Sequence, residues 1–167
     1  MLNKIGKITP GAPGVDAGAP PGQFVTEKFP VMTSHTATGE IPEFDSGKWV
    51  FTIDGAVDAQ VVMNYETFLQ IGIKTVESEF HCVTQWSKLH NIWEGVLFKD
   101  VLRQVSVQTR AKYAMIHCFG DYSINLPLDV LMDDDVLFAI KHDGHEITVE
   151  HGAPLRLVVP KLSLIHI

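Results

Sequence analysis

Phe80-His-Cys-Val-Thr-Gln-Trp-Ser-Lys-Leu-His-Asn-Ile-Trp-Glu-Gly-Val96 is the stretch of this sequence that decides the fold. It begins at the end of an alternating run, residues 73–83, whose β-formers predict a strand that leads into His81-Cys82. A cysteine at the end of a strand can reach a buried cofactor, and its thiolate is a soft ligand for zinc, copper or a heavier transition metal. The stretch therefore holds a candidate metal ligand.

Two His-Cys pairs, His81-Cys82 and His117-Cys118, leave three interpretations open. The spacing alone favours two small core cysteines whose neighbouring histidines point to the opposite side of a strand. A zinc site built from all four residues is the second interpretation, although neither pair has the tight CxxC or HxxxH spacing of structural zinc sites. A single cysteine that ligates one metal is the third.

The segments around this stretch predict short strands joined by tight turns, with few helices. Asp54-Gly55 and Asp143-Gly144 suit the positive φ of hairpin turns, and no βαβ alternation repeats. The predicted class is therefore α+β, with mixed β-sheets and short helices. The predicted strands are 49–55 with 61–63, 73–83, 113–119 with 122–126, 136–142 with 147–149, and 155–159; the predicted helices are 64–71, 97–105 and 127–131.

Composition and charge restrict the classes to which the protein can belong. The 167 residues suffice for one domain, and 46% hydrophobic with 20% charged residues are typical of a folded chain. The net charge of −7 argues against nucleic-acid binding, and two cysteines make no disulfide framework. No apolar run reaches the roughly 20 residues of a membrane span, and we find no secretory signal. We expect a cytoplasmic protein whose Gly- and Pro-rich residues 1–22 form a flexible leader.

Arg156 stands inside the otherwise apolar run 155–159, after His151-Gly-Ala-Pro154. A buried guanidinium demands an anionic partner such as a carboxylate or a phosphate. The alternative is an arginine on the solvent face of an edge strand, and the residues alone leave both open. The remaining histidines lie in predicted loops, turns or the tail, and we expect most of them to be solvated; they are His35, His90, His142, His145 and His166.

Two motifs in order give the chain a specific resemblance. Residues 80–96 resemble the cysteine motif of the sulfite-oxidase-like molybdopterin oxidoreductases, and His151-Gly-Ala-Pro-Leu-Arg-Leu-Val-Val-Pro-Lys161 resembles the pterin-binding segment of that family. Residues 126–144 look like the stretch between them. The resemblance implies a sulfite-oxidase-like molybdopterin-binding fold over residues 23–162, followed by a divergent tail, residues 163–167.

By this resemblance the cofactor is molybdopterin carrying molybdenum, and Cys82 is both the thiolate ligand of the metal and the catalytic residue. Arg156 pairs with the phosphate of the cofactor, and His151 takes the place of a pterin-contacting Asn or His. Cys118 falls where relatives have a small polar residue near the cofactor. The extended segment 26–29 looks like the N-terminal cofactor-contacting strand of the family, with contacts from Thr26, Lys28 and Phe29.

The implied activity is two-electron oxygen-atom transfer on a small oxo substrate, either reduction of an S- or N-oxide or oxidation of sulfite. Gln85 and Lys88 follow the cysteine and no arginine is near in sequence, which favours an S- or N-oxide unless folding brings in Arg103 or Arg110. The chain lacks the haem and dimerisation domains of full sulfite oxidases, so we expect a separate electron-transfer partner. It also departs from the family after Leu162, which leaves a cofactor-free binding module or inactive fragment of the same fold as the alternative.

Overall fold

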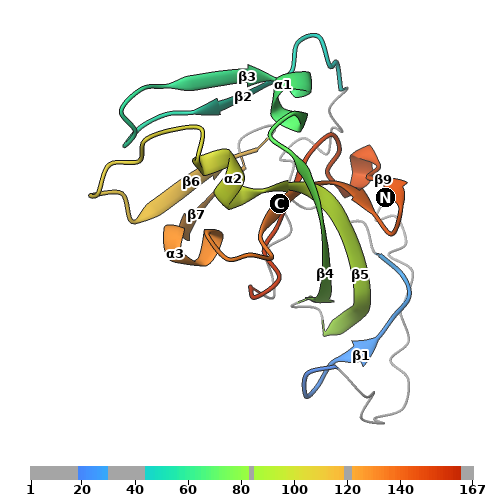
Figure 1. The fold of residues 1–167 in the computed structure, drawn as a ribbon. Helices are drawn as coiled ribbons and strands as arrows, with labels where there is room; N and C mark the ends of the chain where they lie inside the picture. Colours follow the sequence, from blue (N-terminus) through green and yellow to red (C-terminus); the bar gives the residue numbers. More distant parts are fainter. Residues whose placement is uncertain (1–18, 30–43, 83–84, 119–121, 163–167) are drawn as a thin grey trace, which may run out of the picture.

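The computed structural model describes residues 19–29, 44–82, 85–118 and 122–162. Most of the leader predicted at 1–22 and the whole tail at 163–167 lie outside the described residues. The main layer is a mixed six-stranded sheet built around one long, curved strand, β5 (Trp86–Leu97), as Figure 1 shows.

Five further strands complete this sheet. β5 pairs antiparallel with β4 and β8 and parallel with β1, while β9 and β10 pair antiparallel with β8. One parallel pair among antiparallel ones makes the sheet mixed, which confirms the predicted class. The bounds of these strands are β1 Phe24–Val25, β4 Ile73–His81, β8 Leu137–His142, β9 His145–Glu146 and β10 Arg156–Val158.

Two antiparallel hairpins stand apart from this sheet and confirm two of the predicted strand pairs. The predicted helices also form, but each is shorter than predicted and at most five residues long. Asn64 caps the first helix as expected, its Oδ1 accepting the backbone N–H of Thr67 at 2.8 Å. These elements are β2 Val50–Ile53 with β3 Val61–Asn64, β6 Tyr113–His117 with β7 Ser123–Pro127, the helices α1 Tyr65–Leu69, α2 Phe98–Leu102 and α3 Leu128–Leu131, and a 3-10 turn, Val149–His151.

The two faces of the main sheet bury two separate hydrophobic clusters, because successive side chains of a strand point to opposite faces. The first cluster contains Val96, Phe138 and Leu157, and both hairpins pack against it. The second cluster lies on the other face and contains Trp93, Cys82 and Val158. Since Arg156 and Val158 are two positions apart in β10, they share this second face. No helix in the described parts of the chain is long and apolar enough to cross a membrane.

Gly95 permits the close pairing of β5 with β8, and its replacement gives a testable prediction. An added Cβ atom would collide with the Phe138 carbonyl and lie 2.7 Å from Ala139 Cα, at a point where the register already shifts. We expect Gly95→Ala to lower the free energy of unfolding by about 3 kcal/mol, the upper range for overpacking. Urea denaturation measures this, and Gly47→Ala, in an exposed turn, is the control. A loss below about 1 kcal/mol would contradict the collision.

Candidate functional site

Cys82 lies immediately after β4, at the turn that leads into β5. Its backbone N–H donates to the Trp86 carbonyl at 2.8 Å, and its own carbonyl accepts the N–H of Gln85 at 3.0 Å. The residue is 1% exposed and packs in the second cluster. The structure thus places the cysteine at a strand end, as the alternation of residues 73–83 predicted, with its side chain in the same cluster that Arg156 faces.

Arg156 is a buried cation, 7% exposed, so the alternative of a solvent-facing edge arginine is wrong. Its Nη1 donates to the His151 carbonyl at 2.6 Å, and its Nε is buried without a hydrogen-bond partner among the described residues. No carboxylate of the described chain forms an ion pair with it. Burial lowers the pKa of the guanidinium to about 10, which shows how strongly this position disfavours an uncompensated charge.

Phe29 and His151 pack together beside this cation. Their rings stack with centroids 4.4 Å apart, and Arg156 Cζ lies 4.9 Å from the Phe29 ring centroid, within the range of a cation–π contact. His151 Nε2 donates to the Phe29 carbonyl at 2.9 Å, which leaves Nδ1 to accept the Thr148 hydroxyl at 3.0 Å. The structure thus brings together three of the predicted site residues, from two ends of the sequence.

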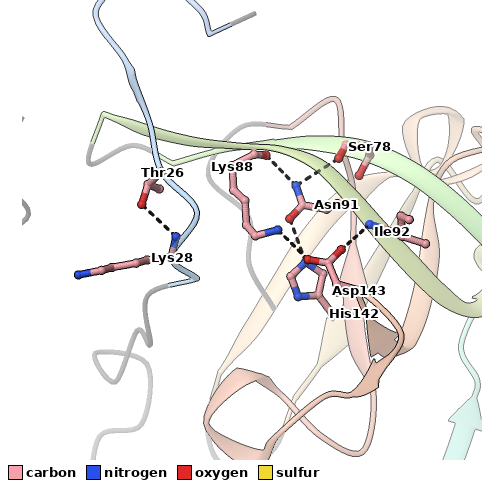
Figure 2. Close-up of polar contacts among 8 residues, drawn as sticks. All are labelled: Thr26, Lys28, Ser78, Lys88, Asn91, Ile92, His142 and Asp143. Carbon is pink, nitrogen blue, oxygen red and sulfur yellow. Dashed lines mark hydrogen bonds and ion pairs between the residues drawn. The ribbon is translucent and has the colours of Figure 1, made fainter. Parts of the chain in front are cut away.

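Thr26 and Lys28 lie on the segment that follows β1. The Thr26 N–H donates to the Ser87 carbonyl at 2.8 Å, which continues the pairing of β1 with β5. The Thr26 hydroxyl accepts the Lys28 N–H at 3.0 Å, and Figure 2 shows the exposed Lys28 side chain pointing away from the neighbouring polar network. Both residues position the backbone that carries Phe29.

Cys118 follows β6, in a hairpin that packs against the first cluster rather than the second. The residue is half-buried, and burial raises the pKa of its thiol to about 11, so it is a neutral thiol at neutral pH. Its predicted place near the cofactor stays a prediction. Within the described ranges, no three His, Cys, Asp or Glu side chains are grouped to hold a metal ion, so the zinc interpretation has no geometric support there.

A pocket opens where the end of β4 meets β10, and Arg156 is the only lysine or arginine among the described residues that line it. Neither Arg103 nor Arg110 joins it. Arg103 is exposed and pairs with Asp100, and Arg110 is exposed and donates to Gln108 at 2.8 Å. The pocket lining is Glu79, Phe80, His81, Arg156, Leu157, Val158, Val159, Pro160 and Leu162.

A polar network that the sequence did not predict joins β5 to the end of β8 and the turn after it (Figure 2). Lys88 Nζ donates to Asp143 Oδ2 at 2.7 Å, and His142 Nε2 lies 2.9 Å from Asn91 Oδ1. The expectation of a solvated histidine is wrong for His142, whose side chain is only 13% exposed, whereas His90 and His145 are exposed as expected. His35 and His166 lie outside the described residues. No local sequence signal links these groups, because they meet through the pairing of β5 with β8.

His142 makes the stability of the fold depend on pH. Desolvation by burial lowers the pKa of its imidazole to about 4; Asp143 raises it, and the nearby charges of Lys88 and Arg156 lower it further. The unfolded chain binds a proton near pH 6.5 and the folded chain only near pH 4, so stability is complete above about pH 6.5 and falls as the pH drops through this window. We expect a loss of up to about 3 kcal/mol from this group. Urea denaturation at pH 7 and pH 4.5 measures it.

The matched variants for this pH effect are His142→Phe and His145→Phe. His142→Phe is expected to reduce the pH-dependent part of the stability, whereas His145→Phe is expected to keep the wild-type slope because His145 is exposed on the neighbouring strand. Equal slopes in the two variants would contradict a role for burial of His142.

Comparison with known proteins places the chain among molybdenum enzymes. The model of the "Oxidoreductase molybdopterin binding domain" matches residues 38–166. The uncharacterized oxidoreductase YuiH of Bacillus subtilis is 37% identical over 144 residues, which are 86% of this chain and 71% of YuiH. The NADPH nitrate reductase of Aspergillus niger is 25% identical over 155 residues, but this chain spans only 18% of its length. The sulfane dehydrogenase SoxCD from Paracoccus pantotrophus shares the fold, with a TM-score of 0.64 and 24% identity over 75% of this chain and 37% of that chain.

The residues of the second face fit the cofactor of this family. A phosphate-bearing group suits a buried guanidinium whose Nε has no partner among the described residues, and a soft metal suits a buried cysteine in the same cluster. The resemblance of residues 80–96 and 151–161 is confirmed by the family match and by the shared fold. The chain therefore belongs to the oxidoreductase molybdopterin-binding domain family, and it is a molybdenum-dependent oxidoreductase of sulfite-oxidase-like fold with molybdopterin as its cofactor.

Proposed function

We propose that Arg156 binds the phosphate of molybdopterin and that Cys82 ligates the molybdenum. The observation that carries this proposal is the buried Arg156 guanidinium, which has one hydrogen bond to a carbonyl and no carboxylate partner in the described chain. Desolvating such a charge costs several kcal/mol, and an anion with oxygen acceptors offsets that cost. A phosphate supplies both the charge and the acceptors.

The predicted residues around Arg156 orient the cofactor. Phe29 and His151 form a stacked pair beside the cation, and His151 is held in one tautomer by hydrogen bonds at both ring nitrogens. Thr26 and Lys28 fix the extended backbone before Phe29. Cys118 would lie near the cofactor as a neutral thiol.

The substrate we propose is a neutral S- or N-oxide. When bound, the cofactor supplies two-electron oxygen-atom transfer. Reduction of a sulfoxide consumes two electrons and two protons, breaks the S–O bond, and yields a sulfide and water. A neutral oxide suits this site better than anionic sulfite, because Arg156 is committed to the phosphate and the nearby Lys88 is neutralised by Asp143 at 2.7 Å. We propose a separate electron-transfer protein as the source of the two electrons.

The test is expression of the full chain in a cofactor-competent host, followed by measurement of molybdenum, pterin and two activities. We expect about one molybdenum and one pterin per chain, and faster methionine sulfoxide or N-oxide reduction with reduced viologen than sulfite oxidation with ferricyanide. Faster sulfite oxidation would contradict the substrate assignment. Negligible metal and pterin would instead support a cofactor-free binding module of the same fold.

A further inference from the structure

A cluster of four aromatic rings connects the core of the second hydrophobic cluster with the proposed cofactor site. Trp93, fully buried, has its ring centroid 4.2 Å from that of His142. The His142 ring lies 4.8 Å from Phe29, and Phe29 lies 4.4 Å from His151. His142 and His151 are therefore the rings nearest to Phe29, which also makes edge contacts with Phe80 at 5.4 Å and with Trp93 at 5.9 Å.

Asn91 fixes the orientation of the His142 ring. Its Nδ2 group donates to the carbonyls of Lys88 at 2.7 Å and Ser78 at 3.2 Å, so its Oδ1 is the atom that faces His142. Nε2 of His142 therefore carries the proton and donates to Oδ1 at 2.9 Å. Because Asn91 is 1% exposed and satisfied by the backbone of two positions, it holds this ring rigidly.

Asp143, in the turn between β8 and β9, and Lys88 of β5 add to this support of the His142 ring. Asp143 Oδ1 accepts the Ile92 N–H at 2.9 Å, and Oδ2 accepts Lys88 Nζ at 2.7 Å (Figure 2). Although desolvation, the largest single effect, raises the pKa of the Asp143 carboxyl, these two hydrogen bonds and the neighbouring charges together lower it. The carboxylate thus joins β5 to the turn that follows His142, and a shift of the ring would break its part-buried hydrogen bond to Asn91.

We propose that His142, which lies outside the predicted set of site residues, is a positioning residue of the cofactor pocket. Its neutral ring, held by Asn91, supports Phe29 and through it His151 and Arg156, so that the segment at residues 26–29 is seated against the site before the cofactor binds. This inference rests on the proposed function for its effect on the cofactor, while the seating of Phe29 is a property of the protein alone.

The first measurement is the pterin content of His142→Ala purified from a cofactor-competent host. We expect about tenfold less pterin per chain than in the wild type, as for loss of an outer-shell support. His142→Phe retains an aromatic ring and is expected to keep at least half of the pterin. His145→Ala, directly opposite in the β8–β9 pairing and exposed, is the matched control with wild-type content.

Val101→Ala separates positioning from general stability. Val101 is buried in the first cluster, on the opposite face of the sheet, so its truncation destabilises the fold without changing the four aromatic rings. We expect this variant to keep wild-type pterin content at a stability loss that matches His142→Ala. Equal pterin loss in both variants, or pterin within twofold of wild type in His142→Ala, would overturn the inference.

The second measurement uses the cofactor-free protein and trypsin, so it does not depend on the proposed function. Cleavage after the exposed Lys28 requires Phe29 to leave its packed position against His142 and His151. We expect this cleavage, followed by mass spectrometry, to be about tenfold faster in His142→Ala than in the wild type or in His145→Ala. An unchanged cleavage rate overturns the inference. A wild type without pterin but with the expected cleavage rates would refute the proposed function and leave the seating of Phe29 supported.

Discussion

Cys82→Ser purified from a cofactor-competent host is expected to contain little molybdenum and to lose more than about 100-fold in oxide-reducing activity. That figure exceeds the losses seen when only an outer-shell partner is removed. A serine hydroxyl stays protonated and is a hard ligand, so it does not replace a soft thiolate at such a metal. Cys82 is buried in the second cluster, and the exchange of sulfur for oxygen leaves its backbone hydrogen bonds in place. Elemental analysis and viologen-coupled assays measure the two effects.

Cys118→Ser is the matched comparison for this prediction. It makes the same chemical change at a thiol whose pKa burial raises to about 11, so that no thiolate is lost at neutral pH. We expect this variant to keep its molybdenum. Full metal content and activity in Cys82→Ser would remove the proposed ligand, whatever the result at Cys118.

Arg156→Met is expected to act in opposite directions on cofactor binding and on the stability of the cofactor-free protein. Loss of charge-assisted hydrogen bonds to a phosphate, each worth about 1.5 to 3 kcal/mol, lowers pterin retention by roughly 10- to 100-fold. Without cofactor, the same change removes a buried charge. Desolvation by burial lowers the pKa of this guanidinium to about 10, which corresponds to about 3 kcal/mol of unfavourable burial. The cofactor-free variant should therefore unfold at a higher urea concentration than the wild type. We expect its free energy of unfolding to be higher by about 1 to 3 kcal/mol.

Pterin fluorescence after denaturation and urea titration measure these two effects. Arg103→Met is the control, because Arg103 is exposed and pairs with Asp100 on the surface. It should change neither quantity. A cofactor-free Arg156→Met that is much less stable than the wild type would show that the cation–π contacts with Phe29 and Phe80 outweigh the desolvation of the guanidinium.

Local sequence patterns predicted the elements that depend on neighbouring residues. The turn at Asp143-Gly144, the cap at Asn64 and the strand that ends before Cys82 all form as expected, since each rests on backbone preferences or alternation within a few positions. The resemblance of two motifs supplied the family and the cofactor, which local patterns did not. Cys82 and Arg156 lie on one face of the sheet, and their roles toward the cofactor stay predictions.

The long strand β5 could not be predicted from alternation. Its buried residues do not follow a period of two, because the strand is covered on both faces and its register shifts near Gly95. Its residue His90 also has a positive φ, which no simple strand pattern anticipates. The network of Lys88, Asn91 and His142 was missed for the same reason, since it exists only once β5 and β8 have paired.

The attachment of β1 has a consequence for the order in which the molecule folds. β1 pairs with β5 over only two residue positions, Phe24 opposite Trp86 and Val25 opposite Ser87, across a long sequence separation. Contacts of this kind form late and open first, because loop closure costs entropy that few bonds repay. We therefore expect the segment that carries Phe29 to dock late in folding. Hydrogen exchange should be fastest at Thr26 among the sheet amides, and a nascent molecule would present Arg156 to solvent until that edge docks.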